Sequence, residues 1–375
     1  MRPVDLAVVG GGVIGCSAAY HAARRGARVV LLEAERLGAG ASGAAAGMLN
    51  AQAEARGEDA FLRLLLKGRE RHRSFAEELR DAGGPDPEYV WEGTLRVATE
   101  ERFAAELRRT YSWQREAGLP ARWLSGEEAR ELEPNLSRGA LAALYLPEDG
   151  QVNSPRLVHA LAQAGARLGV RFLEAARVTG FAVAGERVTG VRTARGEEVA
   201  AGCVVLAGGA ASALLAGELG LRLPVSPVKG EIISVAALPA PVTANVWDDR
   251  CYLVPKRDGR VVIGATQEPG VYDRRPTLGG VATLSGAAVG LVPALSGATF
   301  LNAWGGLRPG TPDGRPVLGP AGGWEGLLIA TGHHRNGVLL APITGEIVAS
   351  LALGDRPPVD VAPFSYERAL QTAAR

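Results

Sequence analysis

The sequence predicts an α/β protein with two interleaved domains, and three observations carry this prediction. An apolar run at 4–9 meets a glycine cluster, passes into an alanine-rich segment at 16–25 and continues into a second apolar run at 27–32. This order is typical of a strand, a tight turn, a helix and a second strand. A similar strand-to-helix pattern returns at 327–351, whereas 225–303 reads as strands separated by proline and glycine.

Periodicity indicates the elements that lie between these two ends. The segment 61–79 places its large apolar residues on one side with charges between them, which is typical of an amphipathic helix. The stretch 100–117 has the same character, and Ser125 with Glu128 forms the capping-box signature of a further helix. Between the first two helices, 91–98 alternates as a strand.

The glycines after the first strand match the pattern G-x-G-x-x-G, with Gly10, Gly12 and Gly15 in its glycine positions. The first glycine allows a sharp turn, the second lets a pyrophosphate approach the helix N-terminus, and the third lets helix and strand pack closely. Glu33 ends the second strand, at the ~20-residue spacing where an acid accepts ribose hydroxyls. A bare glycine-rich turn is the alternative, but the strand–helix–strand context favours dinucleotide binding.

We therefore expect a Rossmann-type dinucleotide-binding domain with a second, sheet-based domain inserted into it. With 375 residues, of which 47% are hydrophobic, the chain can bury two cores. The predicted dinucleotide-binding domain comprises 1–82, 148–222 and 305–375, and the predicted substrate-binding domain comprises 83–147 and 223–304. No repeat or low-complexity linker separates these segments, so the domains are expected to be interleaved.

Charge and residue content argue against several function classes. The 41 Lys and Arg balance the 40 Asp and Glu to a formal net charge of +1, which gives no global field to recruit nucleic acid or an anionic membrane.

The three cysteines, Cys16, Cys203 and Cys251, cannot all pair in disulfides and form no C-x-x-C motif, which fits a reducing cytoplasm. The N-terminal apolar run is broken by glycines, so neither a signal peptide nor a transmembrane segment is expected. His333 and His334 are adjacent and cannot both face one metal ion, so no metal site is predicted.

A run of small residues at 38–49 follows Glu33 closely. Small residues let the backbone lie close to a flat, bulky group, which favours a flavin dinucleotide over a nicotinamide one. A flexible linker is the alternative, although a linker would contain more serine, proline or charge.

Five further sequence blocks lie at 46–49, 252–255, 262–266, 304–314 and 332–337. They resemble blocks of the bacterial glycine oxidases, within the D-amino acid oxidase and sarcosine oxidase family of FAD-dependent enzymes. The resemblance extends from residue 4 to about residue 350 and implies an FAD-binding domain of the glutathione-reductase-like type. The blocks keep the order that they have in that family.

The resemblance implies a role for each matched position. Arg308 would pair with the substrate carboxylate, Tyr252 would hydrogen-bond to it, and Arg335 would lie nearby. Val178 would touch the adenine end, and 333–339 would wrap the isoalloxazine ring at the start of the last helix, whose positive end favours reduced flavin. The residues expected to contact FAD are Gly10, Gly12, Val13, Ile14, Gly15, Glu33, Ala34, Ala41, Ser42, Ala46, Gly47, Met48, Val178, His333, His334, Arg335, Asn336, Gly337, Val338 and Leu339.

The residues themselves also support Arg308 as a carboxylate ligand. It stands between glycines and a proline, in what reads as a loop without a helical charge partner, and a planar guanidinium is the natural bidentate partner of a carboxylate. A salt bridge to Asp313 is the alternative for Arg308, an exposed loop position for Arg335, and a core position for Tyr252. In the sarcosine oxidase branch a cysteine carries the flavin covalently; 308–319 contains none, so FAD is expected to bind non-covalently.

The resemblance implies the oxidation of glycine or another small amino acid. A hydride would pass from the α-carbon to the flavin, the imine would hydrolyse to a 2-oxo acid and ammonia, and dioxygen would become hydrogen peroxide. No acid or base residue is needed for C–H cleavage in this scheme. The family also implies a role in making the thiazole of thiamine.

Some alternatives stay open at this point. Gln267 occupies a position where the glycine oxidases have methionine, and a polar side chain there could admit a different amine. The enzyme alternatives are a D-amino acid or sarcosine-type oxidase and a quinone-linked amino acid dehydrogenase. A flavin subunit of a multi-chain complex, serving assembly or electron relay only, is the alternative of another class. A homo-oligomer is also left open.

Overall fold

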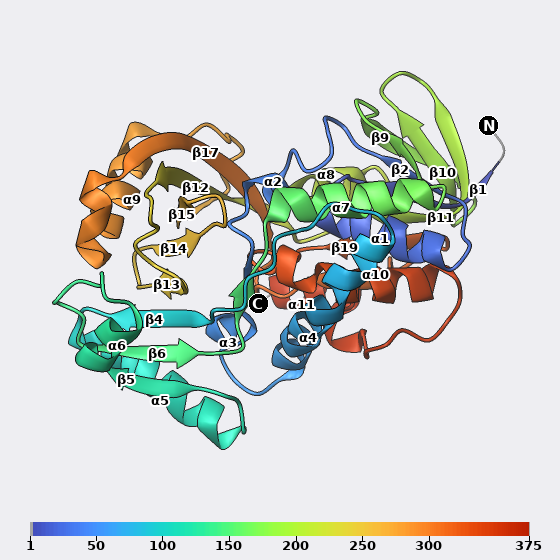
Figure 1. The fold of residues 1–375 in the computed structure, drawn as a ribbon. Helices are drawn as coiled ribbons and strands as arrows, with labels where there is room; N and C mark the ends of the chain where they lie inside the picture. The colour runs from blue at the N-terminus through green and yellow to red at the C-terminus, as the bar shows by residue number, and fades with distance from the viewer. Residues whose placement is uncertain (1–2, 375) are drawn as a thin grey trace.

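Two large sheets organise residues 3–374, the part of the chain that the computed structural model describes (Figure 1). The first sheet has eight strands. β1 pairs in parallel with β2 and β11, and β11 pairs in parallel with β19. Its strands are β1 (Val4–Val9), β2 (Val29–Leu32), β8 (Arg171–Leu173), β9 (Val178–Ala184), β10 (Arg187–Thr193), β11 (Glu198–Leu206), β18 (Val317–Pro320) and β19 (Leu327–Thr331).

Each face of the first sheet is covered by a separate hydrophobic core. In β1, Leu6 and Val8 belong to the core under the helices, whereas Ala7 and Val9 belong to the core shared with β9 and β10. Burial on both faces explains why 6–9 of β1 and the whole of β2 read as unbroken apolar runs in the sequence. The helices over the first face are α1 (Val13–Arg24), α4 (Ala60–Asp81), α7 (Ser154–Arg167) and α10 (Gly337–Ala352).

The second sheet has nine strands, and its two longest strands form one side of it. β17 pairs along the whole of β12 and, in Figure 1, arches toward the first sheet. The strands are β4 (Thr94–Ala98), β5 (Arg122–Ser125), β6 (Ala142–Leu146), β12 (Ser226–Ala236), β13 (Asn245–Trp247), β14 (Tyr252–Pro255), β15 (Arg260–Gly264), β16 (Glu268–Pro269) and β17 (Thr299–Gly310).

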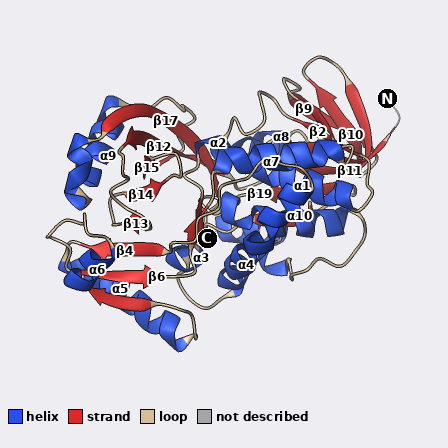
Figure 2. Cartoon of the chain, viewed as in Figure 1, coloured by secondary structure: helices blue, strands red, loops and turns tan. Residues whose placement is uncertain are grey.

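Three helices lie at the outside of the second sheet, as Figure 2 shows. We call the second sheet with these helices the second lobe, and the first sheet with its helices the first lobe. They are α5 (Glu101–Glu116), α6 (Gly126–Leu132) and α9 (Leu278–Leu291). The capping box predicted at Ser125 and Glu128 is confirmed at the start of α6, with both of its hydrogen bonds formed.

The connecting segments between the lobes contain short elements only. They are α2 (Ala41–Ala44), β3 (Met48–Leu49), α3 (Ala51–Glu54), β7 (Gly150–Gln151) and α8 (Ser212–Gly217). β3 and β7 pair to form a separate two-stranded sheet.

The structure corrects three sequence-based expectations. The sequence predicts strands throughout 225–303, but α9 occupies Leu278–Leu291. A Cβ at Gly280 would lie 1.3 Å from the carboxylate of Glu231, so this helix needs glycine for a tertiary reason that the sequence alone does not reveal. The C-terminal helix α11 (Tyr366–Ala373) was also missed. Arg308 lies on β17 and not in a loop.

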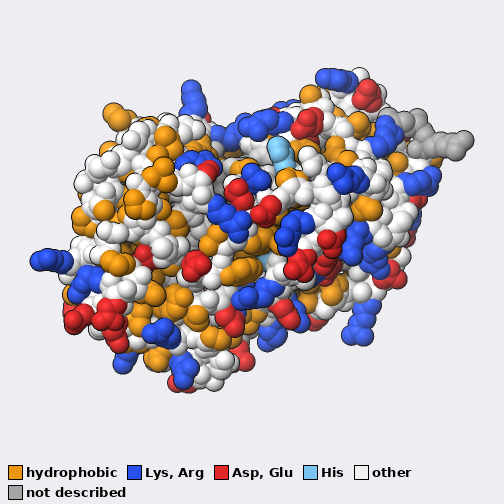
Figure 3. Space-filling view, viewed as in Figure 1, with side chains coloured by type: hydrophobic (Ala, Val, Ile, Leu, Met, Phe, Trp, Pro, Cys, Tyr) orange, Lys and Arg blue, Asp and Glu red, His pale blue; other side chains and the backbone are white. Residues whose placement is uncertain are grey.

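The predicted boundary between 304 and 305 lies inside β17, and the division of the chain into domains stays a prediction. On the face drawn in Figure 3, positive and negative side chains are interspersed, in keeping with the near-zero net charge.

Candidate functional site

A cavity of about 570 Å³ lies between the first sheet and the β12–β17 pair. This volume is within the range of roughly 300–1,000 Å³ that is typical of ligand pockets. Its walls come from segments that are far apart in the sequence: the turn after β1, 33–54, 207–215, 306–309 and 330–338.

The glycine turn after β1 forms one end of this cavity. Gly10 has a φ of 112°, and a Cβ there would lie 2.5 Å from the carbonyl oxygen of Ala207, so only glycine fits. The N–H of Val13, at the start of α1, donates to Ser42 Oγ at 2.9 Å. Gly15 does not line the cavity; a Cβ there would lie 1.9 Å from the carbonyl oxygen of Gly10, so Gly15 is needed for close helix–strand packing.

Glu33 connects this glycine turn to the end of β2. Its carboxylate accepts hydrogen bonds from the N–H groups of Gly11 at 2.6 Å and Glu35 at 2.8 Å. Glu33 lines the cavity and is only half-buried, so an acidic acceptor lies beside the glycine turn that precedes α1.

An arginine of the second lobe reaches over the same end of the cavity. Arg274, which follows β16, donates to the carbonyl oxygen of Ala39 at 3.0 Å and to the Glu35 carboxylate at 3.0 Å. All three residues line the cavity. Sequence reasoning missed this contact, because nothing in the sequence pairs an arginine in one lobe with an acid in the other.

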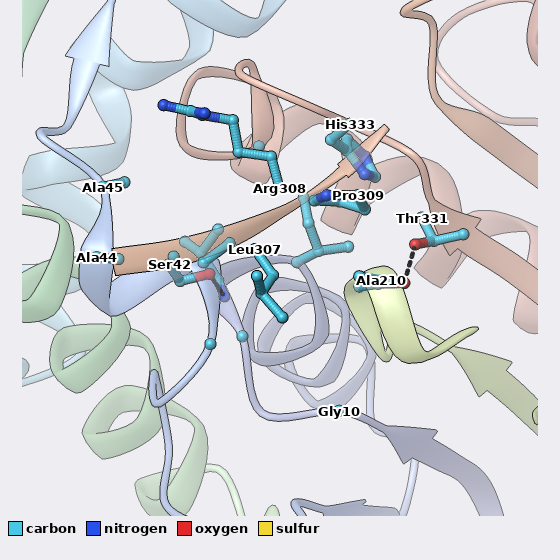
Figure 4. A pocket seen from close by; sticks show the side chains of 18 of the residues that line it. Gly10, Ser42, Ala44, Ala45, Ala210, Leu307, Arg308, Pro309, Thr331 and His333 are labelled. Atoms are coloured by element: carbon cyan, nitrogen blue, oxygen red, sulfur yellow. Dashed lines mark hydrogen bonds between the residues drawn. The ribbon is translucent and has the colours of Figure 1, made fainter. Parts of the chain in front are cut away.

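Arg308 stands at the opposite end of the cavity, on β17. In Figure 4 the side chains of Arg308 and Leu307 leave β17 on opposite sides. The guanidinium donates to the carbonyl oxygen of Thr266 at 3.3 Å and forms no ion pair with a carboxylate among residues 3–374. The alternative partner, Asp313, pairs instead with Arg368 at 2.5 Å.

The space for this guanidinium is provided by a glycine on the neighbouring strand. A Cβ at Gly230 would lie 2.3 Å from both terminal nitrogens of Arg308. Burial lowers the pKa of Arg308 from its ordinary value, and Tyr252 partly reverses this effect. The chain therefore keeps a cation in a poorly hydrated place without a charged partner of its own.

Tyr252 lies beside Arg308 and is packed against a second glycine. It stands opposite Gly264 in the β14–β15 ladder, where a Cβ would lie 2.4 Å from the tyrosine hydroxyl. Burial raises the pKa of Tyr252, so the phenol stays protonated and can donate a hydrogen bond. Tyr252 is both a member of a small apolar cluster and a residue of the cavity wall.

Arg335 and His334 complete this end. Arg335 pairs with Glu54 at 3.1 Å and lies over the ring of Trp247 at 5.0 Å. His334 has a φ of 49° and donates its N–H to the carbonyl oxygen of Pro309. Burial, together with Arg308 and Arg335, lowers the pKa of His334 to about 4, so its imidazole is neutral.

The loop before α10 brings backbone to the middle of the cavity. His333 turns its ring into the core, where Nε2 lies 3.2 Å from Thr344 Oγ1, and burial lowers its pKa to about 3. Leu339 is buried and does not line the cavity. All the other residues that the resemblance assigns to the cofactor line it, apart from Gly15.

Sequence reasoning missed one wall, the segment 207–211 that follows β11. Thr331 Oγ1 donates to the carbonyl oxygen of Gly209 at 2.9 Å and joins this segment to β19 (Figure 4). The signal that could have found it is the pair Gly208-Gly209, because β11 is the parallel neighbour of β1 and its carboxyl end meets the same edge.

A second, polar cavity of about 430 Å³ adjoins the first, and we call it the outer chamber. Tyr252, Arg308 and Arg335 line both cavities. The outer chamber is also lined by Arg96 and by Gln267, the residue that departs from the family pattern.

Residues 3–374 contain neither a metal-binding cluster nor a membrane-spanning helix. No cluster of three or more His, Cys, Asp or Glu side chains there could hold a metal ion. No helix between residues 3 and 374 is long and apolar enough to cross a membrane.

Comparisons with known proteins agree with this geometry. A family model described as FAD dependent oxidoreductase matches residues 5–351. Glycine oxidase of Geobacillus kaustophilus is 43% identical over 97% of both chains. The crystal structure of glycine oxidase from Geobacillus kaustophilus superposes with a TM-score of 0.94 at 41% identity, covering 98% of this chain and 99% of that one. The bifunctional protein ThiO/ThiG of Synechocystis is 34% identical over 98% of this chain and 54% of its own length.

These matches confirm the predicted α/β fold class and extend over the glycine turn, both cavities and most of α10. The chain belongs to the DAO family of FAD-dependent oxidoreductases.

Proposed function

We propose that this protein oxidises the carbon–nitrogen bond of glycine or another small amino acid, with FAD bound non-covalently. The observation that carries the proposal is Arg308, an unpaired cation beside a protonated Tyr252 at the end of the cavity of about 570 Å³, which we call the FAD cavity. The resemblance to glycine oxidases supports glycine as the leading substrate.

The residues of the cavity fit FAD. Gly10 and Gly12 bring the N-terminus of α1 to the position where a pyrophosphate is held, and Glu33 can accept ribose hydroxyls. Along the middle, Gly47 has a φ of 86° and a Cβ there would overlap the carbonyl oxygen of Val152 at 1.9 Å. The backbone can therefore lie close to a flat ring system. No cysteine lines this cavity, which supports a dissociable cofactor.

Arg308 and Tyr252 would bind the substrate carboxylate. A guanidinium makes two parallel hydrogen bonds to a carboxylate, and the protonated phenol adds a third donor. These contacts fix the α-carbon at the cofactor, where FAD, when bound, accepts two electrons as hydride and then passes them to dioxygen. His334 is neutral and Glu54 is paired with Arg335, so the chain supplies orientation and exclusion of water and no acid or base at this end.

Two further parts of the proposal rest on less direct support. The relative in Synechocystis is named ThiO/ThiG, and the chain covers 54% of it, which supports a role in making the thiazole of thiamine. The three cysteines are free thiols, which supports a reducing compartment such as the cytoplasm.

A substrate panel tests the proposal on the purified yellow holoenzyme. Glycine, sarcosine, D-alanine and L-alanine are supplied anaerobically, and bleaching of the flavin band is recorded, followed by peroxide and quinone assays in air. Bleaching by glycine with release of hydrogen peroxide and glyoxylate is expected. Reduction that passes to quinone but not to dioxygen would assign a dehydrogenase, and a flavin that no amine bleaches would assign a relay subunit.

A further inference from the structure

The helix α10 contains a proline that interrupts its own hydrogen-bond ladder. The helix begins at Gly337, and Pro342 lies inside it. A proline has no N–H, so Pro342 cannot donate to the carbonyl oxygen four residues earlier, which belongs to Val338. Val338 lines the FAD cavity and stands in the first turn of α10. The missing hydrogen bond therefore falls at the end of the helix that faces the cofactor.

A histidine from another helix supplies the donor that this carbonyl lacks. Nε2 of His72, on α4, lies 2.9 Å from the carbonyl oxygen of Val338, and Nδ1 lies 2.6 Å from the hydroxyl of Tyr89. A carbonyl oxygen can only accept, so Nε2 carries the proton. Burial lowers the pKa of His72 to about 4 and raises the pKa of Tyr89. The imidazole is therefore neutral, and the protonated phenol donates to Nδ1.

The helix α4 approaches α10 closely enough for this contact to form. Gly68 stands four residues before His72, on the same face of α4. A Cβ at Gly68 would lie 2.7 Å from the carbonyl oxygen of Leu339, in the first turn of α10. His72 is itself fully buried, so water is not at hand to replace it as a donor. A glycine and a histidine one turn apart thus fit α4 to the start of α10.

The first turn of α10 also presents donors to the cavity. The N–H groups of Gly337 and Val338 have no acceptor within the helix, as at any helix start. Within residues 3–374 no backbone carbonyl outside α10 accepts from them, and both residues line the FAD cavity. Such N–H groups and the positive end of the helix favour the electron-rich reduced flavin. How well they do so depends on where the first turn is held.

We propose that His72 is a positioning residue for the flavin, because it replaces the hydrogen bond that Pro342 cannot make and so holds the first turn of α10 in place at the cofactor. His72 does not line the FAD cavity and acts through Val338. The inference rests on the proposed function only in placing the isoalloxazine ring at the start of α10. It does not depend on which amine is oxidised.

The first test replaces His72 by phenylalanine, which keeps a ring of similar size but has no donor. His72→Phe is expected to raise the Kd for FAD about fivefold or more, because a buried carbonyl loses its partner. The midpoint potential of the bound flavin should become more negative. His72→Gln keeps a side-chain N–H near the place of Nε2 and should retain most of both properties. Fluorescence titration of the apoprotein gives the Kd, and reduction alongside a reference dye gives the potential.

A double variant separates the hydrogen bond from the shape of the side chain. Pro342→Ala restores an N–H that can donate to Val338 within α10. Added to His72→Phe, it should bring the Kd for FAD back to within about twofold of the unmodified value and restore the potential. Pro342→Ala alone should change little, since a carbonyl oxygen has two lone pairs and can accept from both donors.

Phe75→Leu is the matched control for loss of packing. Phe75 is a fully buried residue of the same helix, and its ring centroid lies 6.4 Å from that of His72. The substitution should lower the temperature of unfolding without changing the flavin potential. Pro342→Ala should not restore the stability that Phe75→Leu loses, because no hydrogen bond is at stake there.

Reduction by the amine gives a further readout. In His72→Phe the rate constant of flavin reduction should fall, whereas the apparent Kd for the amine should stay the same, because Arg308 and Tyr252 lie on the second sheet. If no amine reduces the flavin, the proposed function fails, and the FAD affinity and the potential still decide the role of His72.

Two results would show that His72 only fills the core. One is a His72→Phe protein that keeps the unmodified affinity for FAD and the unmodified potential. The other is a loss that Pro342→Ala does not reverse. If His72→Phe folds only together with Pro342→Ala, the inference is supported. If neither folds, ¹⁵N NMR of the histidine-labelled unmodified holoenzyme decides: a proton on Nε2 alone is expected for His72, and a proton on Nδ1 would overturn the inference.

Discussion

At the scale of single residues, two glycines create the space for the proposed substrate ligands. Gly230 leaves room for the guanidinium of Arg308, and Gly264 leaves room for the ring of Tyr252. The sequence suggested both ligands through family resemblance, but it could not show these glycines, because each acts across a strand pair and lies at least 12 residues from its partner. Sequence reasoning also missed Arg274 for the same reason, because only the fold brings this arginine to the cavity.

Replacing Arg308 by alanine is expected to lower kcat/KM for glycine about thirty- to several-thousandfold. Most of the change should fall on KM, because the carboxylate keeps its charge throughout the reaction. Arg308→Lys should recover only part of the activity, since an ammonium cannot make two parallel hydrogen bonds. Steady-state kinetics and FAD content are measured together. Unaltered kinetics, or loss of FAD with unfolding, would contradict the assignment.

Glu33→Ala is expected to weaken FAD binding about ten- to a hundredfold, with little change in amine preference. Part of the loss arises inside the protein, because Glu33 also accepts the N–H groups of Gly11 and Glu35. Glu33→Gln keeps one carbonyl acceptor and should lose less. Fluorescence titration of the apoprotein with FAD measures both variants, and a changed ranking of amines with an unchanged Kd would mean that Glu33 is misassigned.

At the scale of elements, local patterns predicted the first sheet well. β1 and β19 have the predicted bounds, because strands buried on both faces leave an unambiguous apolar run. α9 was missed because four glycines interrupt its pattern, and Gly280 leaves room for Glu231 of β12. The contact of Arg274 with Glu35 joins a loop of the second lobe to the end of β2 and covers the cavity.

Arg274→Ala is therefore expected to speed FAD dissociation about two- to fivefold, the range for an exposed ion pair. Added salt should speed release from the unmodified enzyme but not from the variant, because salt screens the pair. Arg275→Ala is the matched control: this neighbour pairs only with Asp273 and does not line the cavity. Stopped-flow fluorescence of released FAD measures the rate, and equal acceleration by both variants would rule out a specific role.

At the scale of the whole molecule, the FAD cavity is assembled from both ends of the chain and both lobes. β17 reaches the cavity from the second sheet, and Lys256, at the end of β14, donates to the carbonyl oxygen of Ala46 at 2.6 Å in the cavity wall. The proposed substrate ligands Tyr252 and Arg308 therefore stand on the second sheet, whereas most of the proposed cofactor residues lie in the turns and connecting segments that follow strands of the first sheet.

Non-covalent binding predicts that acid precipitation releases all flavin as free FAD into the supernatant. None of the three cysteines lines the FAD cavity, so no thiol of the described residues is placed on its wall to form a tether. Chromatography of the supernatant identifies the flavin. Yellow colour that stays with the precipitate, or release of FMN, would disprove this prediction.

The spread of the cavity along the chain has a consequence for how the enzyme acquires its flavin during biosynthesis. The glycine turn leaves the ribosome early, but the loop before α10 is translated more than 300 residues later. At about 5–20 residues per second, the interval is roughly 15 to 65 seconds. A nascent chain therefore has no complete binding site for FAD until translation is nearly finished. Loading of the flavin therefore becomes a late event of maturation, which follows the synthesis of nearly the whole chain.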